Sequence, residues 1–336
     1  MANFDFDLRE LIFLERANLE KSPFNLTQEN FQAKMAARSQ LCHVLSAEVI
    51  KFCEGLGLKN REEILKNLWQ LWLPLAVELR NKKEKLKRTF VQGILGGQGT
   101  GKSTLTAILK LILERFGYSV ATLSIDDLYL TYERRKRLQQ QDSRLIWRGP
   151  PGTHDVRLGL EVIDGCIKNS GSILLPRFDK SLFQGAGDRT ASEAIDKVDI
   201  LLFEGWFVGA RPLTDENVFN DPPAPIVTSE DKQFAIDNNR RLKVYVSLWE
   251  KLDSLVVLNP VDYRLSKQWR REAEQKMKAE GKTGMSDAEI DRFVEYFWKS
   301  LHPELFITPL IDNLNSTDLV VDIERDRSIK FVRKAI

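Results

Sequence analysis

The chain has 336 residues, long enough to bury a large α/β core without disulfide or metal cross-links. Fifty Lys and Arg side chains nearly balance 48 Asp and Glu, so the net charge of +2 provides no field that would attract nucleic acid or an acidic membrane. The three cysteines, Cys42, Cys53 and Cys166, lie in apolar stretches without C-x-x-C spacing, which favours buried thiols in a reducing cytosol. The acidic N-terminus and the lack of any uncharged run of about 18 residues predict a soluble cytoplasmic protein that binds neither nucleic acid nor membrane.

Residues 1–87 contain two stretches with apolar side chains at helical spacing and no convincing strand. The first stretch runs from Met35 to Ile50 and the second from Ile64 to Trp72. The pattern predicts an N-terminal helical segment, in which Pro74 kinks or ends the second helix. The charged run at residues 81–88 is interpreted as a solvated boundary, so the main domain is expected at residues 88–336.

From residue 89 onward, short apolar runs alternate with helical patterns, which is typical of βαβ units. The fold class expected is α/β, with three layers and a central parallel sheet flanked by helices. The candidate strands are residues 90–95, 119–124, 172–175, 198–203, 254–258 and 317–323.

The strongest motif is G-G-Q-G-T-G-K-S, which matches G-x-x-x-x-G-K-[ST] between an expected strand and an expected helix. Glycines let the backbone N–H groups surround phosphates, Lys102 reaches the β- and γ-oxygens, and Ser103 offers its hydroxyl to Mg²⁺. The motif predicts binding of ATP with Mg²⁺. The predicted nucleotide-binding residues are Gly96, Gly97, Gln98, Gly99, Thr100, Gly101, Lys102, Ser103 and Thr104.

Two further strands end in carboxylates. Asp126 and Asp127 follow residues 119–124, and Glu204 follows residues 198–203. An acid at a strand end beside the phosphate loop either helps to order Mg²⁺, directly or through water, or accepts the proton of an attacking hydroxyl. One of the two adjacent aspartates is expected to cap the following helix instead.

The motif alone does not choose a reaction. A GTPase would need an N-K-x-D element and a transport ATPase a separate L-S-G-G-Q signature, and the sequence has neither outside the phosphate loop. A small-molecule kinase is therefore favoured. A regulatory ATPase without an acceptor remains as an alternative from another functional class.

Six elements in order resemble the D-glycerate 3-kinase family of plant and cyanobacterial type, within the phosphoribulokinase and uridine kinase group of P-loop kinases. They are the phosphate loop, S-I-D-D-L-Y at 124–129, G-P-P-G-T-H-D at 149–155, R-F-D-K-S at 177–181, F-E-G-W at 203–206 and W-R-R at 269–271. The resemblance covers residues 88–336. It implies phosphorylation of D-glycerate to 3-phosphoglycerate, the photorespiratory reaction, with ATP and Mg²⁺. A nucleoside or pantothenate kinase is the nearest alternative.

The resemblance also implies residue roles. Asp126 activates the acceptor hydroxyl. Lys102, Glu204 and Arg270 are further catalytic residues. Ser103 and Glu204 bind the metal, directly or through water. A basic lid at about residues 263–285 closes over ATP, and Arg264, Arg270 and Arg271 are its candidate phosphate contacts. Arg177 and Lys180 are the first choices to bind a substrate carboxylate, with Arg148 and Arg189 behind them. The residues expected to bind substrate are Asp127, Tyr129, His154, Asp155, Arg177, Asp179 and Lys180.

Overall fold

The structure is a computed structural model that describes residues 8–169, 171–279, 281, 284–313 and 316–335. Residues 1–7 of the expected helical segment, and residues 280, 282 and 283 of the expected lid, lie outside the described residues. In the part that is described, no helix is long and apolar enough to cross a membrane.

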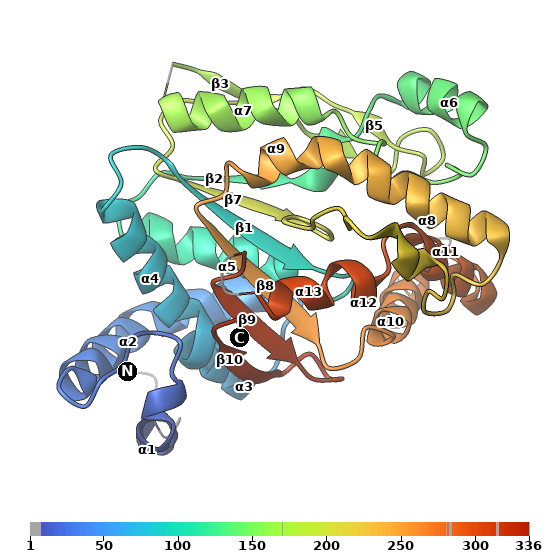
Figure 1. Ribbon diagram of the computed structural model, residues 1–336. Helices are drawn as coiled ribbons and strands as arrows, with labels where there is room; N and C mark the ends of the chain where they lie inside the picture. Colours follow the sequence, from blue (N-terminus) through green and yellow to red (C-terminus); the bar gives the residue numbers. More distant parts are fainter. Residues whose placement is uncertain (1–7, 170, 280, 282–283, 314–315, 336) are drawn as a thin grey trace.

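A six-stranded sheet forms the centre of the molecule, in the order β10-β9-β8-β1-β7-β2 (Figure 1). The five strands from β9 to β2 run parallel, whereas β10 is antiparallel to β9 at one edge. The strands are β1 Phe90–Gly96, β2 Val120–Ser124, β7 Ile200–Gly205, β8 Ser254–Pro260, β9 Leu319–Ile323 and β10 Ile329–Arg333. Five of the six expected strands thus form the predicted parallel sheet.

The expected strand at residues 172–175 does not join this sheet. It is present as β3 (Ile173–Leu175) and pairs antiparallel with β6 (Glu193–Ile195), outside the central sheet. The prediction was wrong because the apolar run was interpreted as buried on both faces, whereas Leu174 is 60% exposed. A second short ribbon joins β4 (Phe178–Asp179) to β5 (Asp188–Arg189).

Alternating side chains of the central strands enter two separate cores. Phe90 and Ile94 of β1 face a core shared with the N-terminal helices and α5, while Val91 and Leu95 face a core on the opposite side of the sheet. The helices of the first side are α1 Leu8–Ala17, α2 Phe31–Gly55, α3 Arg61–Asn67, α4 Leu73–Glu84 and α5 Lys102–Arg115. The opposite side is covered by α7 Val156–Lys168, α8 Ser229–Leu242, α9 Val246–Trp249, α12 Pro303–Phe306 and α13 Thr308–Ile311 (Figure 1).

Three further helices lie near the carboxyl ends of the strands. They are α6 Tyr132–Gln141, α10 Leu265–Ala279 and α11 Asp287–Ser300, and α10 packs on α11. Because β1, β2, β7 and β8 all end at this edge, the segments that follow them meet there, as expected for a ligand site in an open parallel sheet.

The helix around Pro74 changes from π-helical to α-helical geometry and continues to Glu84. Residues Leu68–Trp72 form a π-helical turn, and Pro74 then falls in the first turn of α4, so the chain stays helical through the proline. The charged run after it is not merely solvated, because Lys82 pairs with Asp318 at 2.9 Å and Arg88 with Asp253 at 2.5 Å. A domain boundary at residue 87 stays a prediction.

Candidate active site

The phosphate-loop motif connects β1 to α5. Gly99 and Gly101 have φ angles of +80° and +86°, a left-handed conformation that glycine adopts without strain. Gly101 is the N-cap of α5, so the free N–H groups and the positive end of the helix face the loop. Lys102 Nζ donates to the Gly97 carbonyl at 3.5 Å, and the Thr100 hydroxyl donates to the same oxygen at 2.9 Å. The end of β1, the loop and the first turn of α5 contain the other expected residues, Gly96, Gln98 and Thr104.

Glu204 lies beside this loop near the end of β7. The strand register places it level with Ile94 of β1 on one side and Ser124 of β2 on the other. Its Oε1 accepts a hydrogen bond from the Ser103 hydroxyl at 3.2 Å, whereas Oε2 is buried without a partner among the described residues. Burial raises the pKa of the Glu204 carboxyl, although the nearby charge of Lys102 opposes the shift.

These two groups fit a magnesium ion that arrives with a nucleotide. Among the described residues, no three His, Cys, Asp or Glu side chains are grouped closely enough to hold a metal ion by themselves. Mg²⁺ in nucleotide sites needs only one or two protein ligands, because phosphates and water supply the others. The unpartnered Glu204 oxygen and the adjacent Ser103 hydroxyl are oxygen donors of the required kind.

Asp126 and Asp127 follow β2 in the short helix η3 (Ile125–Leu128), and their carboxylates have different partners. Asp127 Oδ2 accepts from the Ser124 N–H at 3.0 Å, while the Ser124 hydroxyl accepts from the Asp126 N–H at 3.2 Å. This capping box gives the capping role to Asp127. Asp126 instead forms an ion pair with Lys180 at 2.6 Å.

The charge on Asp126 is stabilised by its surroundings. Burial opposes ionisation, but Lys180, Lys102 and the Tyr129 hydroxyl together outweigh it and lower the pKa of the Asp126 carboxyl below the ordinary value. The side chain keeps 26% of its surface exposed, so an incoming molecule can reach it. Asp126 is therefore an accessible carboxylate at neutral pH.

Arg177 is bound to protein groups on several sides. Its guanidinium pairs with Glu193 at 2.7 Å and with Asp127 at 3.3 Å, and it also donates to the Thr122 carbonyl at 3.2 Å. By contrast, Lys180 has a single ion-pair partner among the described residues and is 60% exposed. Of the two cations expected to bind a substrate carboxylate, Lys180 is the freer one.

Aromatic rings form one wall beside Asp126. Tyr129 stacks on His154, with ring centroids 4.6 Å apart, and meets Phe178 edge-on at 5.0 Å. The Arg148 guanidinium lies over both Tyr129 and Phe178, at 5.9 and 5.6 Å from their ring centres. A cation and an ordered aromatic wall thus stand next to the carboxylate.

Two arginines hold the loop between β4 and β5. Arg148 donates to the carbonyl oxygens of Gly185 and Ala186 at 2.7 and 3.0 Å, and Arg135 donates to those of Ala186 and Gly187. Arg135 lies in a charged run at residues 133–137, but its guanidinium stacks on the Phe178 ring. The loop that carries Lys180 is therefore held in place through its backbone.

Two of the expected substrate-binding acids have local structural partners. Asp155 is the N-cap of α7 and also pairs with Arg134 and Arg189, at 2.8 and 3.1 Å. Asp179 closes a turn by accepting from the N–H and hydroxyl of Ser181, at 2.8 and 2.6 Å. Their substrate-binding roles remain predictions.

The arginines of the expected lid are paired with acids. Arg270 pairs with Glu274 in α10, Arg271 with Asp291 of α11 at 2.6 Å, and Arg264 with Asp262 at 3.1 Å. A phosphate contact from any of them requires that its pair opens. None of the three is brought to the phosphate loop by a hydrogen bond within the described residues.

A hydrogen bond to the phosphate loop comes instead from Arg327, which belongs to no sequence motif. Arg327, in the turn between β9 and β10, donates from Nε to the Gly99 carbonyl at 3.2 Å and lies over the Trp269 ring at 5.4 Å. Trp269 in turn packs so closely on Gly99 that a Cβ there would lie 2.6 Å from the Trp269 Cβ. Trp269 belongs to the W-R-R element and could be found from its motif, whereas no pattern marks Arg327.

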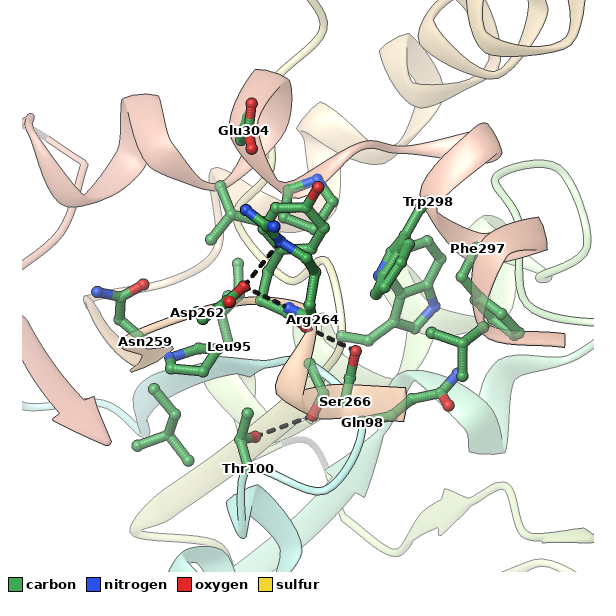
Figure 2. A pocket seen from close by; sticks show the side chains of 18 of the residues that line it. Leu95, Gln98, Thr100, Asn259, Asp262, Arg264, Ser266, Phe297, Trp298 and Glu304 are labelled. Atoms are coloured by element: carbon green, nitrogen blue, oxygen red, sulfur yellow. Dashed lines mark hydrogen bonds and ion pairs between the residues drawn. The ribbon is translucent and has the colours of Figure 1, made fainter. Parts of the chain in front are cut away.

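A pocket with a volume of about 440 Å³ lies on the β8 side of the phosphate loop. Figure 2 shows Arg264 near its centre, with Trp298 and Phe297 to one side and Asn259 to the other. The phosphate loop contributes Gly97, Gln98 and Thr100 to its lining, and α11, α12 and α13 cover it. Asp126 and Lys180 are not among its lining residues, because the strand order places β7 and β2 on the other side of β1.

Known proteins resemble this chain over most of its length. It is 31% identical over 275 residues to the chloroplastic D-glycerate 3-kinase of Arabidopsis thaliana, covering 77% of this chain and 58% of that protein. It is 32% identical over 254 residues to a probable ATP-dependent kinase of Saccharomyces cerevisiae, covering 70% of this chain and 84% of the yeast protein. The chain thus spans less than two thirds of the plant protein, but most of the yeast one.

A solved structure of a D-glycerate 3-kinase from Cryptococcus neoformans matches the fold with a TM-score of 0.71 at 27% identity. The match covers 79% of this chain and 99% of the fungal one. No family model matches the chain.

Proposed function

Because this chain belongs to the family of P-loop kinases that includes D-glycerate 3-kinase, we propose that it transfers the γ-phosphoryl group of ATP to D-glycerate. The products are ADP and 3-phosphoglycerate. The observation that carries the proposal is the Asp126–Lys180 ion pair at 2.6 Å, which places a base and a cation together at the edge where the phosphate loop ends. A hydroxy acid needs both groups, one for its hydroxyl and one for its carboxylate.

Asp126 accepts the proton of the attacking hydroxyl. Before substrate binds, Lys180 helps to lower the pKa of Asp126 and so weakens it as a base. When the substrate carboxylate pairs with Lys180, Lys180 stabilises the charge on Asp126 less. The pKa of Asp126 then rises. Binding of the correct acid therefore prepares the base. The Tyr129 hydroxyl, which bonds to Asp126, keeps the carboxylate oriented.

The cations around this site have separate tasks in the proposal. Lys180 binds the substrate carboxylate, and Arg148, held over Tyr129 and Phe178, adds positive charge nearby. Arg177 acts through Asp127, with which it pairs at 3.3 Å. Lys102 and the N-terminus of α5 bind the transferred phosphoryl group, and Arg270 remains a proposed phosphate contact once its pair with Glu274 opens.

Mg²⁺ completes the proposed site. Ser103 and Glu204 would hold it, either directly or through water, and the bound ion would supply positive charge to offset the charge of the ATP phosphates. A cation that faces Oε2 also offsets the cost of burying the Glu204 carboxylate.

The proposal is tested by measuring ADP release with D-glycerate, L-glycerate, uridine, cytidine and pantothenate as acceptors. Release that depends on D-glycerate and is lost in Lys102→Ala supports it. ADP release that is indifferent to every acceptor would instead indicate a regulatory ATPase.

A kinase for a nucleoside or pantothenate is the second candidate, and the aromatic wall of Tyr129, His154 and Phe178 beside Asp126 is the observation that favours it, because aromatic side chains stack on nucleoside bases. The same acceptor series decides between them, because a nucleoside kinase prefers uridine or cytidine over any hydroxy acid.

We propose further that the chain acts in the cytosol and does not bind nucleic acid. Its near balance of basic and acidic residues supports the second point. The relative from Arabidopsis thaliana is named as chloroplastic, so the compartment needs a direct test by fractionation of the source cells.

A further inference from the structure

His154 is a buried histidine whose two ring nitrogens have different surroundings. The side chain is 5% exposed and stacks on Tyr129, the residue whose hydroxyl bonds to Asp126. Its Nδ1 lies 2.8 Å from the hydroxyl of Tyr245, which is itself buried at 1% exposure. Its Nε2 is buried and has no hydrogen-bond partner among the described residues.

The partners of Tyr245 determine where the imidazole proton sits. The Gly152 N–H donates to the Tyr245 oxygen at 2.8 Å, and the backbone of His154 also bonds to that oxygen. Because backbone N–H groups occupy the lone pairs of the Tyr245 oxygen, the Tyr245 hydroxyl donates its hydrogen to His154 Nδ1. Nδ1 is then the acceptor, and the single ring proton of the neutral imidazole must be on Nε2.

An Nε2–H group that is buried without an acceptor is costly, and such groups need an explanation. Tyr129, whose ring stacks on His154, bonds to Asp126 through its hydroxyl, so the imidazole lies one residue away from the proposed base. Because Nε2 is buried, a substrate oxygen reaches it only after a neighbouring side chain moves.

We infer that Tyr245 holds His154 as the Nε2–H tautomer, so that the buried ring presents a neutral hydrogen-bond donor to a carboxylate oxygen of the acceptor. Tyr245 is a positioning residue and acts only through His154. The inference rests on the proposed function for the identity of the acceptor, but not for the tautomer itself.

Neutrality gives this donor a specific use beside Asp126. Burial lowers the pKa of His154 to about 3, so the ring neither carries a charge nor takes up a proton near neutral pH. It therefore cannot compete with Asp126 for the hydroxyl proton. Lys180 binds the substrate by charge, whereas His154 adds a directional contact that selects an oxygen at one position.

The tautomer is tested without any activity measurement, by ¹⁵N NMR of the histidine rings in the whole protein. Only three histidines occur, so His154→Gln assigns the His154 signals directly. We expect a protonated Nε2 and an unprotonated Nδ1, and a shift toward a mixture of tautomers in Tyr245→Phe. A protonated Nδ1 in the unchanged protein overturns the inference.

The substrate contact is tested by kinetics in matched variants. Glutamine reaches about as far as Nε2 with a donor N–H, whereas asparagine reaches only about as far as Nδ1. We expect His154→Gln to keep the KM for D-glycerate within about threefold and His154→Asn to raise it about tenfold, the typical effect of one hydrogen bond to a charged group. An unchanged KM in His154→Asn refutes the contact.

Tyr245→Phe is then compared in two backgrounds, the otherwise unchanged protein and the His154→Gln protein. A positioning role predicts that Tyr245→Phe raises the KM for D-glycerate several-fold when His154 is present and has no effect on KM in the His154→Gln protein. A merely structural role predicts equal effects in both, and that result overturns the inference. If the unchanged protein shows the Nε2–H tautomer but does not use D-glycerate, the proposed substrate is refuted while the tautomer assignment stands.

Discussion

Asp126 and Asp127 should respond differently when each is replaced by asparagine, because one is proposed to act in catalysis and the other to stabilise the fold. The two carboxylates are adjacent in the chain, yet Asp127 accepts the Ser124 N–H at 3.0 Å and pairs with Arg177, while Asp126 faces Lys180. Asparagine keeps the shape of either side chain but cannot take a proton or carry a charge. We expect Asp126→Asn to lower kcat and Asp127→Asn to lower stability.

The magnitudes follow from these partners. A general base contributes about 10² to 10⁴ in rate, so kcat of Asp126→Asn should fall by that factor while ATP affinity stays within a few-fold. In Asp127→Asn the amide oxygen still accepts the Ser124 N–H, but the pair with the partly exposed Arg177 is lost. This change should cost on the order of 1 kcal/mol in the free energy of unfolding and lower kcat by less than about tenfold.

The assay is ADP release at saturating substrates, measured beside thermal unfolding of the same preparations. If Asp127→Asn is the more damaging change and raised Mg²⁺ or Mn²⁺ partly restores it, the two roles are reversed. If neither change lowers kcat by about tenfold, Asp126 is no base and transfer relies on positioning alone.

Three other changes test separate parts of the site. Lys102→Ala and Ser103→Ala should each reduce turnover by at least about 10²-fold with little change in thermal unfolding, since the proposed partners of both side chains are the phosphates and Mg²⁺; near-normal turnover in Lys102→Ala would contradict the proposed nucleotide site. Lys180→Ala should raise the KM for D-glycerate about tenfold to a hundredfold and leave that for ATP nearly unchanged, whereas Arg177→Ala should mainly lower stability; the opposite pattern would make Arg177 the carboxylate ligand after all. The pH dependence of unfolding should reveal the neutral His154: its pKa is about 3 in the folded protein and about 6.5 when unfolded, so the unfolded state binds the extra proton between these values. The free energy of unfolding should therefore fall by up to about 1.4 kcal/mol per pH unit below pH 6.5 relative to His154→Gln, and parallel curves for the two proteins would disprove a neutral ring.

The parts of the site that are set by local chemistry could be predicted from the sequence. The phosphate loop was recognisable because glycine, lysine and serine spacing is dictated by the phosphates, and Gly99 and Gly101 adopt a left-handed conformation that favours glycine. Asp126, Asp127 and Glu204 were found because apolar runs mark buried parallel strands whose ends share one edge.

Contacts between distant segments were not predictable in the same way. Arg177 meets Asp127 from 50 residues away, and Tyr245 meets His154 from 91 residues away, so neither pair leaves a local pattern. The edge strand β10 was missed because Ile329 and Phe331 alternate with polar residues over only five positions. Residues 172–175 were misplaced because a short apolar run does not reveal whether one face or both are covered.

In the proposed reaction, the γ-phosphoryl group passes from ATP to the hydroxyl on carbon 3 of D-glycerate. The most direct test is ³¹P and ¹³C NMR of the products formed from ATP, Mg²⁺ and D-glycerate labelled with ¹³C at carbon 3. We expect one phosphate ester, with phosphorus coupled to the labelled carbon, formed in step with ADP. ADP accompanied only by inorganic phosphate, or an ester on another acceptor and none on glycerate, would contradict it.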